Sequence, residues 1–161
     1  IMKINILLIA LLMTISISCS SKKSIAANYS NPTECLGVEL DGSQTLKAWG
    51  NGRNRQDAVD QAKKNAIRDV IFKGIRDGKS ECNTKPLVFE VNAQDKYEDY
   101  FNVFFADGGE FKNFISLKDE RIFDKVYRDK QKTSENVVHG LVVRVLRSEL
   151  KQKLIQDGII K

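Results

Sequence analysis

The sequence predicts an α+β fold: a small, mostly antiparallel sheet covered by one long alanine-rich helix and one or two shorter helices. Three patterns predict it, namely short strands joined by hairpin turns, one long helical segment with alanine at every fourth position, and a valine-rich strand near the C-terminus. Strands joined by hairpins form antiparallel sheets, and amphipathic helices bury one side against such a sheet. Hydrophobic residues make up 42% of the chain, which is enough to build a core.

A β-hairpin is predicted at residues 35–50. Two short apolar segments flank Asp41-Gly42, a pair that tolerates the positive φ angles of a two-residue type I′ turn. Side chains alternate along the second segment, so that Leu46 lies on an apolar face and the single tryptophan, Trp49, lies on the other.

The clearest helix lies between Asn54 and Gly78. Asn54 is a natural N-cap, and Asp57 three residues later approximates a capping box. Gly78 stands where a glycine commonly ends a helix. The small residues that would let this helix lie close to the sheet recur every four positions, at Ala58, Ala62 and Ala66.

The middle of the chain combines a strand candidate and a helix. Residues 86–92 predict a short strand that opens with a proline. Residues 93–111 begin with a helical pattern and end at the Gly108-Gly109 turn.

The C-terminal part predicts a second hairpin and a closing helix. Residues 120–131 suit a helix by spacing and a strand by their β-branched and aromatic content, and we favour the strand. Residues 133–136 would then form the turn into the valine-rich strand 137–146. A short amphipathic helix with Leu150 and Leu154 inward completes the fold.

The N-terminal segment has the pattern of an export signal. Its apolar run at residues 4–17 is shorter than the roughly 20 residues that a transmembrane helix needs. The run ends in Ser16-Ile17-Ser18-Cys19, which resembles a bacterial lipobox. The resemblance implies cleavage before Cys19, a diacylglyceryl group on its sulfur and an acyl chain on the new amine. The alternative is an ordinary secreted protein with a chance cysteine.

These features divide the chain into three regions. Residues 1–18 are expected to be a lipoprotein signal peptide, and residues 19–33 a lipid-anchored flexible tether rich in small polar residues. Residues 34–161 are expected to form a single α+β domain, because their number is typical of one domain.

The two cysteines that remain if Cys19 is lipidated are Cys35 and Cys82. In an oxidising compartment they would form a structural disulfide that closes a loop of about 48 residues, which the chain-entropy estimate values at about 4 kcal/mol. The alternative is a redox or metal pair, but the sequence has no CxxC motif and a single histidine. We favour the structural disulfide.

The chemistry-bearing motifs are incomplete, so no catalytic residue, metal ligand or cofactor is assigned. Gly50 and Gly52 lie between a strand and a helix, as in a phosphate-binding loop, but Arg55 occupies the place of the third glycine of a dinucleotide motif. We therefore interpret the two glycines as a turn and packing motif. The single histidine, His139, lies within a strand and has no nucleophile motif to serve, so we interpret it as structural.

The charge pattern argues against nucleic acid as a partner. The formal net charge is +5, but lysines and arginines are interspersed with carboxylates and form no basic run.

Aromatic residues are the feature most suggestive of binding. Most of those between Tyr97 and Phe114 should belong to the core, yet there are more of them than one helix face buries easily. Aromatic side chains are enriched at interface centres. The candidates for partner contact are Trp49, Tyr97, Tyr100, Phe105 and Phe111, the last two presented by a surface loop.

A segment of about residues 45–78 resembles a module of bacterial envelope proteins, in which a strand that ends in a Gly-x-Gly turn leads into a helix with alanine every four residues. The segment is similar to the amino-terminal domain of flagellar assembly protein T and to the small outer-membrane lipoproteins that share it. The resemblance implies that Gly50 and Gly52, with the alanines named above, form the turn and helix of that module. The rest of the chain looks closer to uncharacterised lipoproteins of Bacteroidetes-type envelopes, which implies an accessory or scaffold role without an activity.

In such envelopes, acidic residues soon after the lipidated cysteine mark surface export. Here Lys22 and Lys23 are basic, so we expect a protein anchored by Cys19 to the outer membrane on its periplasmic face. The first functional hypothesis is a non-enzymatic accessory or scaffold lipoprotein that docks onto an envelope protein complex. The alternative is a lipoprotein that binds glycan or peptidoglycan fragments in a cleft lined by Trp49 and the tyrosines. A hydrolase is the third hypothesis, and it would need polar groups clustered in one pocket.

Overall fold

The computed structural model describes residues 31–116, 130–132 and 137–161. The chain divides into two units, Ile1–Ser30 and Asn31–Lys161, and all the described residues belong to the second. The predicted signal peptide, Cys19 and most of the predicted tether therefore lie outside the described residues, as do most of the predicted strand 120–131 and the predicted turn 133–136.

The last residues of the predicted tether belong to the folded unit. Thr33 is buried, and its hydroxyl donates a hydrogen bond to the Asp69 carboxylate over 2.5 Å. This hydrogen bond joins Thr33 to the π-helix Asp69–Lys73 within the unit Asn31–Lys161.

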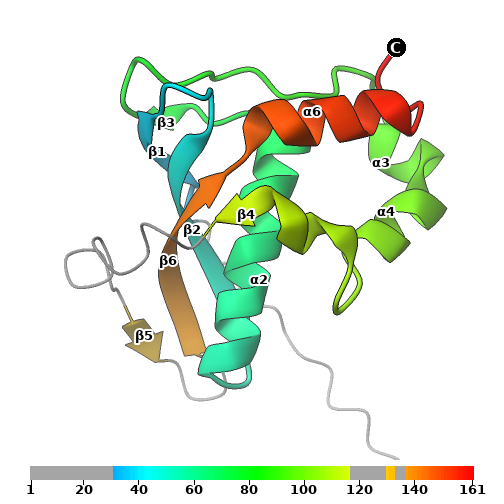
Figure 1. The fold of residues 1–161 in the computed structure, drawn as a ribbon. Helices are drawn as coiled ribbons and strands as arrows, with labels where there is room; N and C mark the ends of the chain where they lie inside the picture. The colour runs from blue at the N-terminus through cyan, green and yellow to red at the C-terminus, as the bar shows by residue number, and fades with distance from the viewer. Residues whose placement is uncertain (1–30, 117–129, 133–136) are drawn as a thin grey trace, which may run out of the picture. The chain divides into compact units, whose positions relative to one another are not determined.

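The fold is α+β, as predicted. The sheet has the strand order β3-β1-β2-β6-β4, and β5 pairs with β6 off this path (Figure 1). Among the described strands, only the pairing of β1 with β3 is parallel. The strands are β1 (Glu34–Val38), β2 (Gln44–Gly52), β3 (Asp77–Gly78), β4 (Ile115–Ser116), β5 (Lys130–Lys132) and β6 (Val137–Val145).

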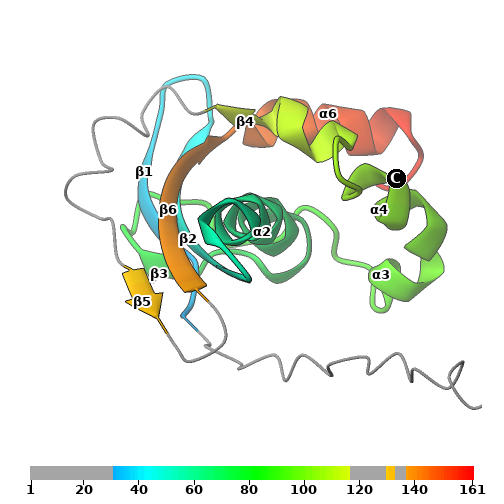
Figure 2. The ribbon, with the colours of Figure 1, turned by 90° about the horizontal axis from the view of Figure 1, so that it is seen from below.

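One long helix, α2, lies directly against the sheet, and the short helices α3 and α4 lie beyond it (Figure 2). Figure 2 shows α2 lying against one face of the sheet and, on its other side, α3 and α4. The helices are α2 (Arg55–Arg68), the π-helix η1 (Asp69–Lys73), α3 (Ala93–Lys96), α4 (Glu98–Phe104), the 3₁₀ helix η2 (Glu110–Phe114) and α6 (Arg147–Gln156). Among the helices of the described ranges, none is both long and apolar enough to span a bilayer.

The β1–β2 hairpin is confirmed, but its turn is not the predicted type. Only Gly42 has a positive φ, of 78°, whereas a type I′ turn would also require one at Asp41. The Gly42 N–H donates to the Glu39 carbonyl, and the Glu39 N–H donates to the Ser43 carbonyl. These bonds define a three-residue loop that ends in a left-handed glycine. Asp41 instead accepts hydrogen bonds from the backbone N–H and the hydroxyl of Ser43, which lower its pKa.

The long helix begins as predicted and ends earlier. The Asn54 side chain accepts a hydrogen bond from the Asp57 N–H, as an N-cap does. The last turns widen into η1, and Gly74, with φ of 74°, ends the helix. The prediction that Gly78 ends the helix is therefore wrong, because Gly78 lies in β3, which pairs with β1.

The alanine stripe of α2 packs against β2, as predicted. Ala58, Ala62 and Ala66 are fully buried. A Cβ atom at Gly50 would overlap the Ala58 carbonyl oxygen and the Ala62 nitrogen, and one at Gly52 would overlap the Ala58 nitrogen. The two glycines lie within β2 rather than in a turn. They are required because the helix backbone approaches the strand where a side chain would otherwise stand.

The predicted strand 86–92 is wrong, because its backbone pairs with a helix end instead of a strand. The Leu87 N–H donates to the Val70 carbonyl over 3.0 Å, and the Val88 N–H donates to the Ile71 carbonyl over 2.9 Å. The last carbonyls of a helix have no partner within the helix. This segment supplies partners for two of them, and therefore runs along the end of η1.

The predicted disulfide between Cys35 and Cys82 is present. Its Cα atoms lie 6.3 Å apart, and 47 positions separate the two residues in sequence. The bond fastens the segment after β3 to β1, in which Cys35 is fully buried.

The C-terminal helix packs its apolar side inward, as predicted, with Leu150 and Leu154 fully buried. Its far end is tied to α4, because the Tyr100 hydroxyl donates to the Asp157 carboxylate over 2.6 Å. Burial and this hydrogen bond both raise the pKa of Tyr100.

Replacing Gly50 with Ala should destabilise the domain. The added methyl group has to displace the backbone of α2 from β2, at a cost of about 3 kcal/mol in free energy of unfolding. Urea denaturation followed by Trp49 fluorescence measures the loss. Gly37→Ala is the control, since the nearest atom to its Cβ would be a Glu81 carboxylate oxygen at 3.7 Å. Equal stability of the two variants would contradict the proposed helix–strand contact.

Removing the disulfide should lower the free energy of unfolding by about 4 kcal/mol, because the unfolded chain regains the freedom of a long closed loop. The comparison is between the full chain and its Cys35→Ala/Cys82→Ala variant in urea, each with and without a reductant. The reductant should destabilise only the unmodified chain. If reduction leaves its unfolding midpoint unchanged, the bond does not contribute in this way.

Candidate binding site

An open cavity of about 460 Å³ lies between the β1–β2 loop, the segment that follows β3, and the first turn of α6. We call it the Arg147 cavity. Polar and charged side chains line it together with apolar ones. The lining residues are Val38, Gly42, Gln44, Glu81, Asn83, Lys85, Pro86, Leu87, Phe89, Arg147, Ser148 and Lys151.

Arg147 is the most unusual of these residues, because it is a buried cation with no carboxylate partner among the described residues. Its exposed fraction is 8%, and burial lowers the pKa of its guanidinium. Nη2 donates to the Lys85 carbonyl over 2.7 Å, and Nη1 lies 3.5 Å from Oε1 of Gln44. Within the described part of the chain, no carboxylate lies within ion-pairing distance of this guanidinium. Buried charges in proteins are normally paired.

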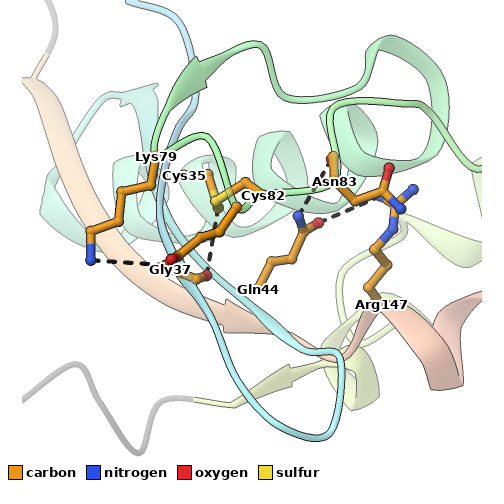
Figure 3. Close-up of a disulfide and its surroundings, with 8 residues drawn as sticks. Cys35, Gly37, Gln44, Lys79, Cys82, Asn83 and Arg147 are labelled. Carbon is orange, nitrogen blue, oxygen red and sulfur yellow. Dashed lines mark hydrogen bonds and ion pairs between the residues drawn. A yellow bond between two sulfur atoms is a disulfide. The ribbon is translucent and has the colours of Figure 1, made fainter.

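Gln44 connects Arg147 to the opposite wall of the cavity. Its side chain is 1% exposed, and Nε2 donates to the Asn83 carbonyl over 3.4 Å. Asn83 directly follows Cys82, so the disulfide holds the backbone that accepts this bond. Figure 3 shows the disulfide and the Gln44–Asn83–Arg147 network side by side.

The other charged side chains of the cavity are mostly cationic. Lys85 and Lys151 are exposed and form no ion pair within the described residues. Glu81 contributes the one carboxylate of the lining, and it lies 4.0 Å from Lys79. The lining therefore carries three cations and one anion.

Exposed apolar side chains border the same cavity. Leu87 is buried, whereas Phe89, two residues later, is 71% exposed. Val38 on the other wall is 38% exposed. Two further exposed apolar side chains lie close by in sequence: Leu40, two residues after Val38, and Val91, two residues after Phe89.

The predicted surface loop with Phe105 and Phe111 is not found. Phe105 is 8% exposed and Phe111 is fully buried, so both belong to the core. Their rings pack together with centroids 5.9 Å apart. A sequence pattern could not show that Lys64 and Arg68 of α2 lie over the Phe111 and Phe105 rings. Tyr97 and Tyr100 are half-buried and pack against the same core.

Trp49 lies on the face of the sheet away from α2. Its ring covers Gly140 on β6, where an added Cβ atom would lie 3.2 Å from the ring. Lys47 Nζ stands 4.8 Å from the ring centroid. The sheet and α2 separate Trp49 from Tyr97 and Tyr100, which belong to the α3–α4 region (Figure 2). These three residues therefore do not line one cleft.

The remaining residues that the sequence singled out, Gly50, Gly52 and His139, are packed within the fold. Gly50 and Gly52 face α2, which fills the space that a phosphate would need. His139 is 2% exposed and lies opposite Gly50 in the β2–β6 ladder. No group of three metal-ligating side chains occurs in the described residues.

Sequence reasoning did not identify Arg147 and Gln44, although one signal was present. Arg147 is the first residue of α6. A cation is disfavoured at a helix N-terminus, where the helix dipole is positive.

Comparisons of the chain with protein-family models, with curated proteins and with solved structures find no match.

Proposed function

We propose that the protein is a lipid-anchored, non-enzymatic accessory component of an outer-membrane assembly, and that it acts by docking onto a neighbouring envelope protein. The observation that carries this proposal is the set of exposed apolar side chains beside the Arg147 cavity, above all Phe89. Aromatic side chains are enriched at the centres of protein interfaces. The segment that bears Phe89 is fastened at Cys82 and along η1, so this side chain is presented on a fixed backbone.

The anchor is proposed from the lipobox-like sequence that ends at Cys19. One acyl chain binds a membrane only marginally, whereas two or more hold a protein firmly. Tethering raises the effective concentration of the docking surface for a partner in the same membrane. The basic residues Lys22 and Lys23 favour the periplasmic face. The disulfide supports an exported protein, because such bonds persist in oxidising compartments.

The resemblance to the envelope module of flagellar assembly protein T concerns β2 and α2. The role that the resemblance implies, as an accessory or scaffold component, agrees with docking. The glycan hypothesis gains no comparable support, since Trp49 belongs to β2 and the two tyrosines belong to the α3–α4 region, on the other side of α2 (Figure 2).

Cys19→Ala should abolish lipidation and release the protein from the membrane fraction. The test is labelling of growing cells with an alkyne fatty acid, followed by fractionation. Cys82→Ala is the control, since it removes a cysteine without touching the lipobox, and it should still be labelled. A wild-type chain that takes up no fatty acid would refute the anchor.

Phe89→Ser should weaken docking without unfolding the domain, because the side chain is already 71% exposed. We expect the loss of most cross-links to neighbouring envelope proteins in intact cells, measured by mass spectrometry. Val103→Ser is a matched control on α4, where the side chain is 74% exposed and lies outside the Arg147 cavity. An unchanged cross-link pattern in Phe89→Ser would exclude this surface.

A further inference from the structure

We propose that the Arg147 cavity binds a phosphate-type oxyanion carried on an apolar body. The same chemistry occurs in the headgroup of an anionic lipid and in a soluble phosphate monoester. This inference shares Phe89 with the proposed docking surface, but it requires neither a protein partner nor the lipid anchor, because the charges and the walls of the cavity carry it.

The charge balance of the cavity favours an anion with more than one charge. Arg147, Lys85 and Lys151 face a single carboxylate, that of Glu81, within the described lining. Glu81 is exposed, and its near neighbour is Lys79 rather than Arg147. Among the residues with a described structure, the buried guanidinium therefore has no carboxylate to compensate its charge, and a bound anion would supply that compensation.

The guanidinium is held in place for such a ligand. The Lys85 carbonyl and Gln44 fix two of its nitrogen atoms, and a guanidinium has five N–H donors. Its planar fork matches the geometry of phosphate oxygens. Arg147 and Ser148 also begin α6, a helix of 10 residues, whose first N–H groups carry no side-chain cap. Such N–H groups favour negative charge.

The apolar wall explains why the anion should have an apolar body. Pro86, Leu87 and Phe89 line one side of the cavity, and Val38 lines another. Hydrophobic groups that surround a few placed polar donors are typical of ligand sites. A free inorganic ion would leave these side chains without a partner.

The test is calorimetric titration of the full chain in non-ionic detergent, at low salt, with two probes. Dihexanoyl phosphatidate carries phosphate on an apolar body, and glycerol 3-phosphate carries phosphate alone. We expect the phosphatidate to bind. If glycerol 3-phosphate binds equally well, the phosphate alone is recognised, a soluble monoester is a sufficient source, and the apolar-body part of the proposal is wrong. If it binds at least tenfold more weakly, the apolar body is part of recognition and a lipid is the source.

Substitutions assign the binding to this cavity. Arg147→Lys should weaken phosphatidate binding about tenfold, because it keeps the charge and loses the fork. The double variant Lys85→Gln/Lys151→Gln changes only exposed side chains, so it can be tested even if Arg147→Lys does not fold. We expect the double variant to bind phosphatidate more weakly and with a smaller dependence on salt concentration. Arg53→Gln is the control, since it removes one positive charge beyond the far end of β2, and it should bind as the wild type does.

Two results would overturn the proposal: a wild-type chain that binds neither probe, or lysine double and Arg147→Lys variants that both bind as the wild type does. A chain that binds neither probe but still cross-links through Phe89 would refute this inference alone. A chain that binds phosphatidate and shows no Phe89-dependent cross-link would refute the docking role alone.

Discussion

The close approach of α2 to β2 at Gly50 is the contact on which the rest of the fold depends. The helix backbone occupies the volume that a side chain at Gly50 would fill. The small, buried alanines of α2 allow the helix to lie this close to the sheet. From this position α2 separates the sheet from α3 and α4 (Figure 2). The η1 turn that continues α2 accepts backbone hydrogen bonds from the segment 87–88. A motif that resembles a phosphate loop in sequence is thus used for packing.

The second constraint is the fastening of the segment after β3 at two places. The disulfide fixes it at Cys82, and the free carbonyls at the end of η1 fix it at Leu87 and Val88. Between these points lie Asn83 and Lys85, whose carbonyls accept hydrogen bonds from Gln44 and Arg147. This wall of the cavity is therefore a backbone segment outside any strand or helix, held at one end by the disulfide and at the other by η1.

Arg147 departs from the rules that the rest of the chain follows. A cation is disfavoured both in the interior and at the start of a helix. Proteins tend to break such rules where function requires it. The arginine is tolerated because the Lys85 carbonyl and Gln44 satisfy part of its hydrogen-bonding capacity. It also lines an open cavity rather than a closed apolar core. Exposed Phe89 at the same place makes this the region of the domain in which binding features concentrate.

The sequence by itself determined the features that local chemistry controls. These are the β1–β2 hairpin, the Asn54 cap, the alanine face of α2 and the inward leucines of α6, each of which follows from periodicity or from one hydrogen bond close in sequence. Only the tertiary structure decided that Gly74 ends the helix, that residues 86–92 pair with a helix end, that Phe111 is covered, and that Gln44 and Arg147 meet. Those outcomes depend on contacts between residues far apart in sequence, such as the 103 positions between Gln44 and Arg147, which no local pattern encodes.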